Sequence, residues 1–332
     1  MRRALPELRR VLDWYFEHYY GRTEGPGTTP FYCDPTRVGG FAVSPQKLAR
    51  GTEAATFRLF VTLAMYQALR DVVVMRRQRS LSRAEVDAVA DLTSVSKCSR
   101  DGGCPGLQRG LSITEYCDVW KRASRIDCGK HPGLECNVKH ATRAFKRMGD
   151  MGKLPVSALE VGWSAGGLNA LVADTIRSEA SPGVRALLLV TTLQRVHRVG
   201  RKLATFFVSA LSTPSLAPGL TPWFPAIDGN ALVIIDTNVA RAVDALRMGR
   251  GQRTYDARAE WLRRQAAEID LRRHRHDVPS YSPRLVQQAL YSFCSKSNRV
   301  AQGDSCREAA PACLGCARRL CPFTVPRRSA AT

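Results

Sequence analysis

Apolar residues recur at helical spacing along most of the chain, and no stretch shows the strict alternation of a half-buried strand. The pattern is clearest over residues 6–20, 56–79 and 282–296. Pro6 and Pro283 each stand at a natural first helical position, which suits the fixed φ of proline. The chain has 332 residues, of which 44% are hydrophobic, so it can bury a sizeable core. The sequence therefore predicts an all-α globular fold.

Helix start and stop signals divide the rest of the chain. Capping boxes begin at Ser82 and Ser112, each with a glutamate three residues later. Glycine, proline and threonine are frequent in residues 21–53, which we expect to form an irregular arm, and prolines mark residues 213–229 as a loop. We expect further helices at residues 138–149, 167–180, 183–196, 200–212, 236–247 and 256–275.

The charge balance is strongly basic. Lys and Arg number 50 against 29 Asp and Glu, which gives a net charge of +21 and a pI near 10.0. Such a surplus attracts polyanions, nucleic acid first and an anionic membrane surface second. No apolar run is long enough to span a bilayer, and no apolar h-region follows the basic start MRRALPELRR. We therefore expect a cytoplasmic protein that binds nucleic acid and has no membrane association.

Four cysteines close to the C-terminus have the spacing C-x6-C-x2-C-x4-C. They are Cys306, Cys313, Cys316 and Cys321. Cytosolic thiols stay reduced, so such a group indicates a metal before disulfides. Zinc held by four cysteines usually draws on two C-x2-C pairs, and this segment has one. An iron–sulfur cube also takes four thiolates and tolerates wider gaps, so we favour a [4Fe–4S] cluster, with zinc or unrelated buried thiols as alternatives.

The spacing of these cysteines resembles the cluster loop of the endonuclease III family of helix-hairpin-helix DNA glycosylases. The last gap is one residue shorter here than is usual in that family. The resemblance implies that residues 306–321 hold a structural cluster, which secures a loop against DNA and performs no redox step on the substrate.

A second segment, residues 193–211 (LQRVHRVGRKLATFFVSAL), resembles the helix-hairpin-helix of the same family, commonly written L-P-G-V-G-R-K-T-A. Such a hairpin directs backbone N–H groups at a DNA phosphate, and its glycines let the two helices approach closely. Val199, Gly200 and Arg201 match the family pattern, and Arg198 stands where the family has its first glycine. The resemblance implies that these four residues contact DNA.

Lys202 occupies the hairpin position whose amine attacks the sugar in family members with lyase activity. Attack on C1′ of a deoxynucleotide requires an amine that can form an imine. Arginine stays protonated and cannot serve, which explains the residue type. Without the hairpin and the cysteine loop, a solvated lysine on a helix face would be the simpler interpretation.

Residues 232–247 (LVIIDTNVARAVDALR) resemble the family segment V-D-T-H-x-x-R, with Asn238 at the histidine position. The resemblance implies that Asp236 stabilises cationic character at C1′ and helps to manage the amine proton. The alternative is a helix N-cap, and one aspartate can fill both roles. Gln67 resembles a family glutamine that probes the gap left by an extruded base. Its alternative is a polar residue on an ordinary core helix.

The segment 92–136 fits no part of the family pattern. Its cysteines, with two histidines nearby, are Cys98, Cys104, Cys117, Cys128, Cys136, His131 and His140. We interpret them first as dispersed thiols in an insertion, and second as an additional zinc site within residues 98–136. Cys33 and Cys294 are interpreted as ordinary buried residues.

The resemblance implies a two-lobed fold. A six-helix barrel lobe is expected over residues 56–211, with the insertion and the hairpin. The second lobe would join residues 1–55 to residues 212–332, which hold the catalytic aspartate and the cluster loop.

The expected function is base-excision repair by a DNA glycosylase with AP lyase activity. A damaged base would be flipped out of the double helix, and Lys202 would attack C1′ with the help of Asp236. The expected partner is double-stranded DNA with damaged or abasic sites, bound by a monomer that is nucleoid-associated if bacterial. Two alternatives stay open: a non-catalytic or monofunctional protein of the same fold without lyase activity, and an electron carrier. The latter lacks the compact C-x2-C-x2-C run of small ferredoxins.

Overall fold

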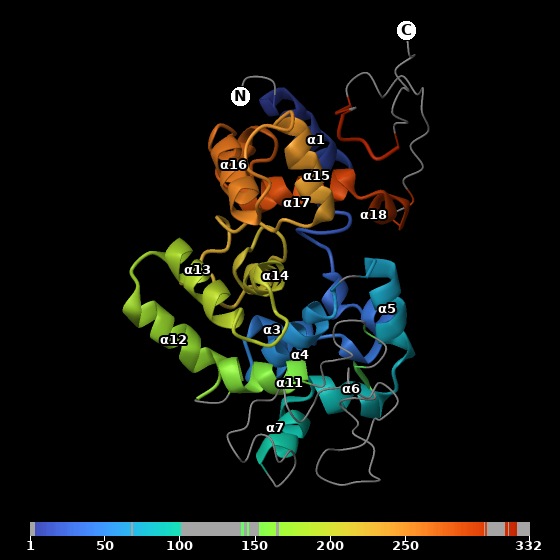
Figure 1. The fold of residues 1–332 in the computed structure, drawn as a ribbon, viewed down its shortest axis with the longest axis vertical. Helices are drawn as coiled ribbons and strands as arrows, with labels where there is room; N and C mark the ends of the chain where they lie inside the picture. The colour runs from blue at the N-terminus through green and yellow to red at the C-terminus, as the bar shows by residue number, and fades with distance from the viewer. Residues whose placement is uncertain are drawn as a thin grey trace. The chain divides into compact units, whose positions relative to one another are not determined.

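The computed structural model describes residues 4–67, 69–100, 141–142, 145, 153–163, 166–301, 303, 316–317 and 319–323. Every regular element in these ranges is helical and none is a strand, which confirms the predicted all-α class for the described part of the chain (Figure 1). The chain forms two compact units. Unit 1 comprises Met1–Thr28, Ser215–Pro218 and Asn230–Thr332, and unit 2 comprises Thr29–Pro214 and Gly219–Gly229. The domain boundary expected at residue 55 thus falls inside unit 2.

Unit 1 is built around one central helix. Its elements are α1 (Ala4–His18), α15 (Thr237–Leu246), α16 (Tyr255–Ala267), the 3-10 turn η5 (Leu271–Arg273), α17 (Pro283–Cys294) and α18 (Lys296–Ala301). The central helix α17 contacts α1, α15, α16 and α18. Its residues are buried nearly all the way round, as is typical of a helix enclosed by its neighbours.

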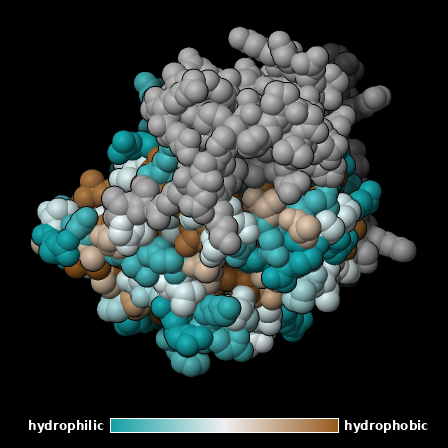
Figure 2. Space-filling model, turned by 90° about the horizontal axis from the view of Figure 1, so that it is seen from below, coloured by the Kyte–Doolittle hydropathy of each residue, from teal (hydrophilic) through white to brown (hydrophobic). Residues whose placement is uncertain are grey.

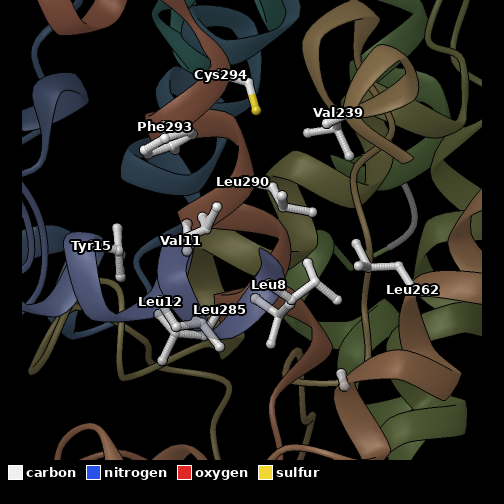
Figure 3. Packing of buried hydrophobic residues seen from close by; sticks show 14 of the residues in the cluster. Leu8, Val11, Leu12, Tyr15, Val239, Leu262, Leu285, Leu290, Phe293 and Cys294 are labelled. Atoms are coloured by element: carbon white, nitrogen blue, oxygen red, sulfur yellow. The ribbon is translucent and has the colours of Figure 1, made fainter. Parts of the chain in front are cut away.

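The core of unit 1 is formed where the apolar faces of these helices meet. Figure 3 shows Leu12 of α1 beside Leu285 of α17, with Val239 of α15 and Leu262 of α16 on the same cluster. All four side chains are almost completely buried. Helix α17 starts at the side chain of Ser282, which accepts the N–H of Leu285 at 3.2 Å. The Ser-Pro pair therefore sets the start of the helix on which the core is built.

Unit 2 begins with short turns, η1 (Phe31–Cys33), α2 (Pro35–Val38), η2 (Gly39–Phe41) and α3 (Pro45–Ala49). The longer elements are α4 (Glu53–Ala64), α5 (Asp71–Ser80), α6 (Arg83–Ala90), α7 (Leu92–Arg100), α11 (Lys153–Ala158), the π-helical turn η4 (Leu159–Trp163), α12 (Leu168–Ser178), α13 (Pro182–Leu193) and α14 (Arg201–Ser212). Helix α4 contacts α14, and both are largely buried. Aromatic rings join them: Phe60 of α4 lies 5.0 Å from Phe207 of α14, nearly perpendicular to it.

The continuous helix expected over residues 56–79 is wrong. Helix α4 ends at Ala64 and α5 begins at Asp71, after Arg70 in extended conformation. The interruption brings the buried amide of Gln78 back onto α4, where its Nε2 donates to the carbonyl of Thr62 at 3.1 Å. Tertiary packing of this amide, and the carboxylate of Asp71 at a helix N-terminus, support a break that the apolar pattern does not signal.

Several other helix boundaries agree with the sequence. Ser82 and Glu85 form the predicted capping box at α6. No helix is formed over residues 213–229, as expected for this loop.

The helix expected over residues 256–275 is shorter than predicted: it ends at Ala267 and is followed by η5. The expected capping box at Ser112 lies outside the described residues, as does most of the expected helix at 138–149.

Among the described residues, no helix combines the length and apolar character needed to cross a membrane. Figure 2 shows one face of the molecule, on which hydrophilic side chains predominate and apolar residues form small separate groups.

Candidate functional site

The hairpin of unit 2 consists of α13 and α14, which pack against each other and are joined by residues 194–200. Val196 and Val199 are buried beneath the turn. The N–H of Val199 donates to the carbonyl of Val196 at 3.0 Å, which closes the turn. Ala204 is fully buried in the first turn of α14. The two valines and the small alanine of the motif therefore hold the turn onto its helices.

Arg198 occupies the turn in a left-handed conformation, with a φ of 61°. Its side chain is exposed to solvent. This conformation is the one that glycine adopts without cost and that other L-residues adopt at a cost of about 1–2 kcal/mol. Arg198 can therefore stand where the similar motif L-P-G-V-G-R-K-T-A has its first glycine. It keeps the glycine-like backbone and directs a cation outward.

Gly200 is the N-cap of α14 and is exposed. Its φ is −85°, and a Cβ added here would meet no atom within 4 Å. Close approach of the two helices, which we expected of the hairpin glycines, is therefore not the reason for glycine at this position. A glycine N-cap has no side chain to cover the helix N-terminus, so the N–H groups of the first turn of α14 receive no hydrogen bond from a side chain of the N-cap.

Lys202 lies in the first turn of α14 and is half-buried. Four residues later, and hence on the same face of the helix, is the half-buried Phe206. The ring of Phe206 stacks on Phe31 with centroids 6.2 Å apart, and Phe31 lies 5.4 Å from the ring of Tyr66. Lys202 therefore lies one helical turn before a phenylalanine that belongs to an aromatic cluster. No sequence motif indicates this aromatic cluster, because Phe31 comes from the segment before α2 and is distant in sequence from Phe206.

Gln67 follows Tyr66 and is half-buried. Its side-chain Nε2 donates to the carbonyl of Ala64 at 2.8 Å, at the C-terminus of α4. The described geometry gives this amide a local capping function. Its contact with DNA stays a prediction.

Asp236 lies in unit 1 as the N-cap of α15. Its Oδ1 accepts the N–H of Val239 at 2.7 Å, so the predicted capping role is present. The preceding residues, Leu232–Ile235, are buried, and the carbonyl of Val233 accepts a hydrogen bond of 2.8 Å from the hydroxyl of Tyr255. The carboxylate is therefore fixed by a helix on one side and by an anchored apolar segment on the other.

Two of the four terminal cysteines, Cys316 and Cys321, lie in the described part and pack against the core of unit 1. The thiol of Cys316 donates a hydrogen bond to the sulfur of Cys321, and this bond is the main cause that lowers the pKa of Cys321 to about 5. Arg299 and the backbone of Phe323 lower the pKa of Cys321 further, while burial opposes them. Metal-binding thiols must be deprotonated, so the lowered pKa of Cys321 fits a role as a thiolate ligand.

Cys306 and Cys313, the other two predicted ligands, lie outside the described residues. The same holds for the cysteines of the expected zinc site within residues 98–136, apart from the backbone of Cys98. Within the described ranges, no three His, Cys, Asp or Glu side chains are grouped as a metal site.

The buried Cys294, at the end of α17, is influenced by charged groups from two parts of the predicted site, the catalytic aspartate and the cysteine loop. Burial raises the pKa of this thiol to about 12, and the charges of Arg241, Asp236, Arg299 and Cys321 all act on it. Asp236 and Cys321 thus both lie within electrostatic range of one thiol in unit 1. Cys294 is buried, as we expected, but its spacing from the other cysteines gives no sign of this proximity.

The predicted site residues are divided between the two units. Lys202, Gln67 and the turn at 198–201 belong to unit 2, whereas Asp236 and the terminal cysteines belong to unit 1. That Lys202 and Asp236 act on one sugar stays a prediction.

Comparisons with protein-family models, with curated proteins and with solved structures find no match to this chain.

Proposed function

We propose that this chain is a DNA glycosylase with AP lyase activity, of the helix-hairpin-helix type. The observation that carries the proposal is the hairpin of unit 2. It combines a tight turn with an exposed glycine N-cap on α14 and places Lys202 in the first turn after that cap. A helix N-terminus without a capping side chain suits a phosphate, and an amine in the first turn would lie near the sugar next to that phosphate.

The charges around the hairpin support binding to DNA. Arg198 is exposed at the turn, and Arg201 is half-buried directly after the glycine cap. With a net charge of +21, the chain binds DNA with an affinity that falls steeply as salt rises. The contacts proposed at the turn involve phosphates, which position the protein and carry no sequence information.

The proposed reaction begins when a damaged base has left the stack. The neutral Nζ of Lys202 forms a bond to C1′, the bond between C1′ and the base nitrogen breaks, and the base leaves with the electron pair and takes up the proton that Nζ loses. Asp236 stabilises the positive charge that develops at C1′. The C1′–O4′ bond then opens, O4′ takes up a proton, and a protonated imine joins Lys202 to the sugar. Loss of a C2′ proton breaks the C3′–O bond and cuts the strand by β-elimination.

The four terminal cysteines, Cys306, Cys313, Cys316 and Cys321, would hold a [4Fe–4S] cluster. The adjacent thiols of Cys316 and Cys321, and the lowered pKa of Cys321, support this assignment. Bound there, the cluster would cross-link a segment too short to build a core of its own. Its role in the proposal is structural.

An incision assay tests the proposal. Labelled double-stranded oligonucleotides carry one abasic site, one oxidised pyrimidine, one uracil, one alkylated base or one mismatch, and strand cleavage is followed on denaturing gels. We expect the wild type to cut the abasic strand and at least one of the lesions. Lys202→Gln should lose cleavage and retain duplex binding.

Lys47→Gln is the matched control, since Lys47 is an exposed lysine of α3 in the same unit. It should cut like the wild type. A wild-type chain that binds the duplexes and cuts none of them would make this a DNA-binding protein without the enzyme activity.

A further inference from the structure

Arg299 of α18 is a buried arginine surrounded by aromatic rings. Only 3% of its surface is exposed. The carbon atom of its guanidinium group lies 4.9 Å from the ring centroid of Trp14, 5.0 Å from that of Phe293 and 4.8 Å from that of Phe323. These rings belong to α1, to α17 and to the tail after the last cysteine. One cation thus joins three segments that are far apart in the sequence.

The same guanidinium group reaches the cysteine loop. Its Nη1 lies 3.8 Å from the Sγ of Cys321, to which it donates, and 3.4 Å from the carbonyl oxygen of Phe293. Ring faces carry partial negative charge and attract a cation, but a buried guanidinium is best compensated by a full negative charge. A thiolate bound to a metal provides such a charge at the sulfur of Cys321.

We propose that Arg299 is a positioning residue of the metal loop, which holds the sulfur of Cys321 against the end of α17 and donates a hydrogen bond to it when the metal is bound. This inference rests on the proposed cluster at the terminal cysteines. A positive charge and a hydrogen bond at a ligand sulfur stabilise the more negative, reduced form of an iron–sulfur centre. Arg299 therefore raises the reduction potential of the cluster and slows the loss of iron.

Helix α18 has a second attachment to unit 1 that does not involve Arg299. The Nδ2 of Asn298 donates to the hydroxyl of Tyr19 at 2.8 Å. Trp14 and Phe293 also contact each other directly, with centroids 5.1 Å apart. Replacing Arg299 thus leaves the helix tethered to unit 1.

The test compares the full chain, purified without oxygen, with Arg299→Met, Arg299→Lys and the control Arg264→Met. Arg264 lies on α16, and its side chain is 69% exposed. Iron and sulfide are counted per chain, iron release to a chelator is timed, and the midpoint potential is measured by spectroelectrochemistry. We expect Arg299→Met to release iron at least about tenfold faster, in line with the loss of other outer partners of metal ligands.

The midpoint potential of Arg299→Met should shift to more negative values, whereas that of Arg264→Met should stay at the wild-type value. Arg299→Lys should fall between the wild type and the methionine variant, because lysine keeps the charge and loses the planar contacts with the rings. If Arg299→Met does not fold, the midpoint potential and the iron release of Arg299→Lys provide the test. A potential and an iron release equal to those of the wild type in the folded variants would overturn the inference and leave the proposed function standing. A wild-type chain without iron and sulfide would overturn the inference together with the proposed cluster.

Discussion

The hydroxyl of Tyr15 donates a hydrogen bond of 2.5 Å to one carboxyl oxygen of Glu24, and the other oxygen accepts one of 2.8 Å from Nε2 of Gln288. Tyr15 lies on α1 and Gln288 on α17, so the carboxyl group joins two helices of the core of unit 1. Burial raises the pKa of Glu24 to about 7, although the hydrogen bonds and the charge of Arg284 act in the opposite direction. The folded chain therefore binds the proton of Glu24 more tightly than the unfolded chain does.

This raised pKa predicts that unit 1 loses stability as pH rises. The contribution is fully present below the ordinary glutamate pKa and is lost as pH rises through the folded value near 7. Between pH 5 and 8 we expect Glu24 to account for a loss of about 2–3 kcal/mol in the free energy of unfolding. Denaturant titrations at both pH values measure it.

Glu24→Gln should remove most of that pH dependence, since a neutral amide can keep the contacts with Tyr15 and Gln288. Glu17→Gln is the control, because the side chain of Glu17 is 72% exposed. It should leave the pH dependence as in the wild type. Equal slopes in Glu24→Gln and the wild type would show that Glu24 is ionised throughout this range.

The left-handed Arg198 predicts opposite effects on stability and on DNA binding. Arg198→Gly removes strain of about 1–2 kcal/mol, which exceeds the entropy of about 0.4–1 kcal/mol that glycine adds to the unfolded chain. Its melting temperature should rise. Its affinity for duplex DNA should fall, and the slope of log K against log salt should become shallower by about 1. An unchanged slope would mean that the side chain of Arg198 contacts no phosphate.

Substitutions of Asp236 separate its capping role from its chemistry. Asparagine is as good an N-cap as aspartate, so Asp236→Asn should alter the melting temperature little, whereas Asp236→Ala should cost about 1 kcal/mol. Both should lower the single-turnover rate of base release by about 10²–10⁴-fold, because neither carries the charge at C1′. A normal rate in Asp236→Asn would reduce Asp236 to a helix cap.

Serine substitutions test the metal ligands, including the two that lie outside the described residues. Cys321→Ser and Cys306→Ser should each lose most of the iron and the visible absorption of the chain purified without oxygen. Cys33→Ser should retain both, since Cys33 is buried in unit 2. Full iron content in Cys321→Ser would place the metal elsewhere.

Local signals predict much of the helical framework. The capping box at Ser82 and the Ser-Pro pair at Ser282 both start helices where the sequence expects them, because each acts through neighbouring residues. The break between α4 and α5 escapes prediction, because it depends on Gln78 returning to the carbonyl of Thr62, a contact between two different helices.

The same distinction between local signals and long-range contacts applies to the candidate site. The turn at 194–200 follows from a short motif, and the structure adds the left-handed backbone of Arg198. The environment of Arg299 escapes prediction, because its rings come from positions 14, 293 and 323. Contacts assembled from such distant segments leave no local pattern in the chain.

The proposed lyase reaction requires the amine of Lys202 to form an imine with the sugar. The most direct measurement is borohydride trapping on a duplex with a single abasic site, read as a covalent adduct on denaturing gels and located by mass spectrometry of the digested complex. We expect an adduct with the wild type, attached at Lys202 and lost in Lys202→Ala. A chain that binds the duplex and yields no adduct, or an adduct that persists in Lys202→Ala, would overturn the proposed attack by Lys202.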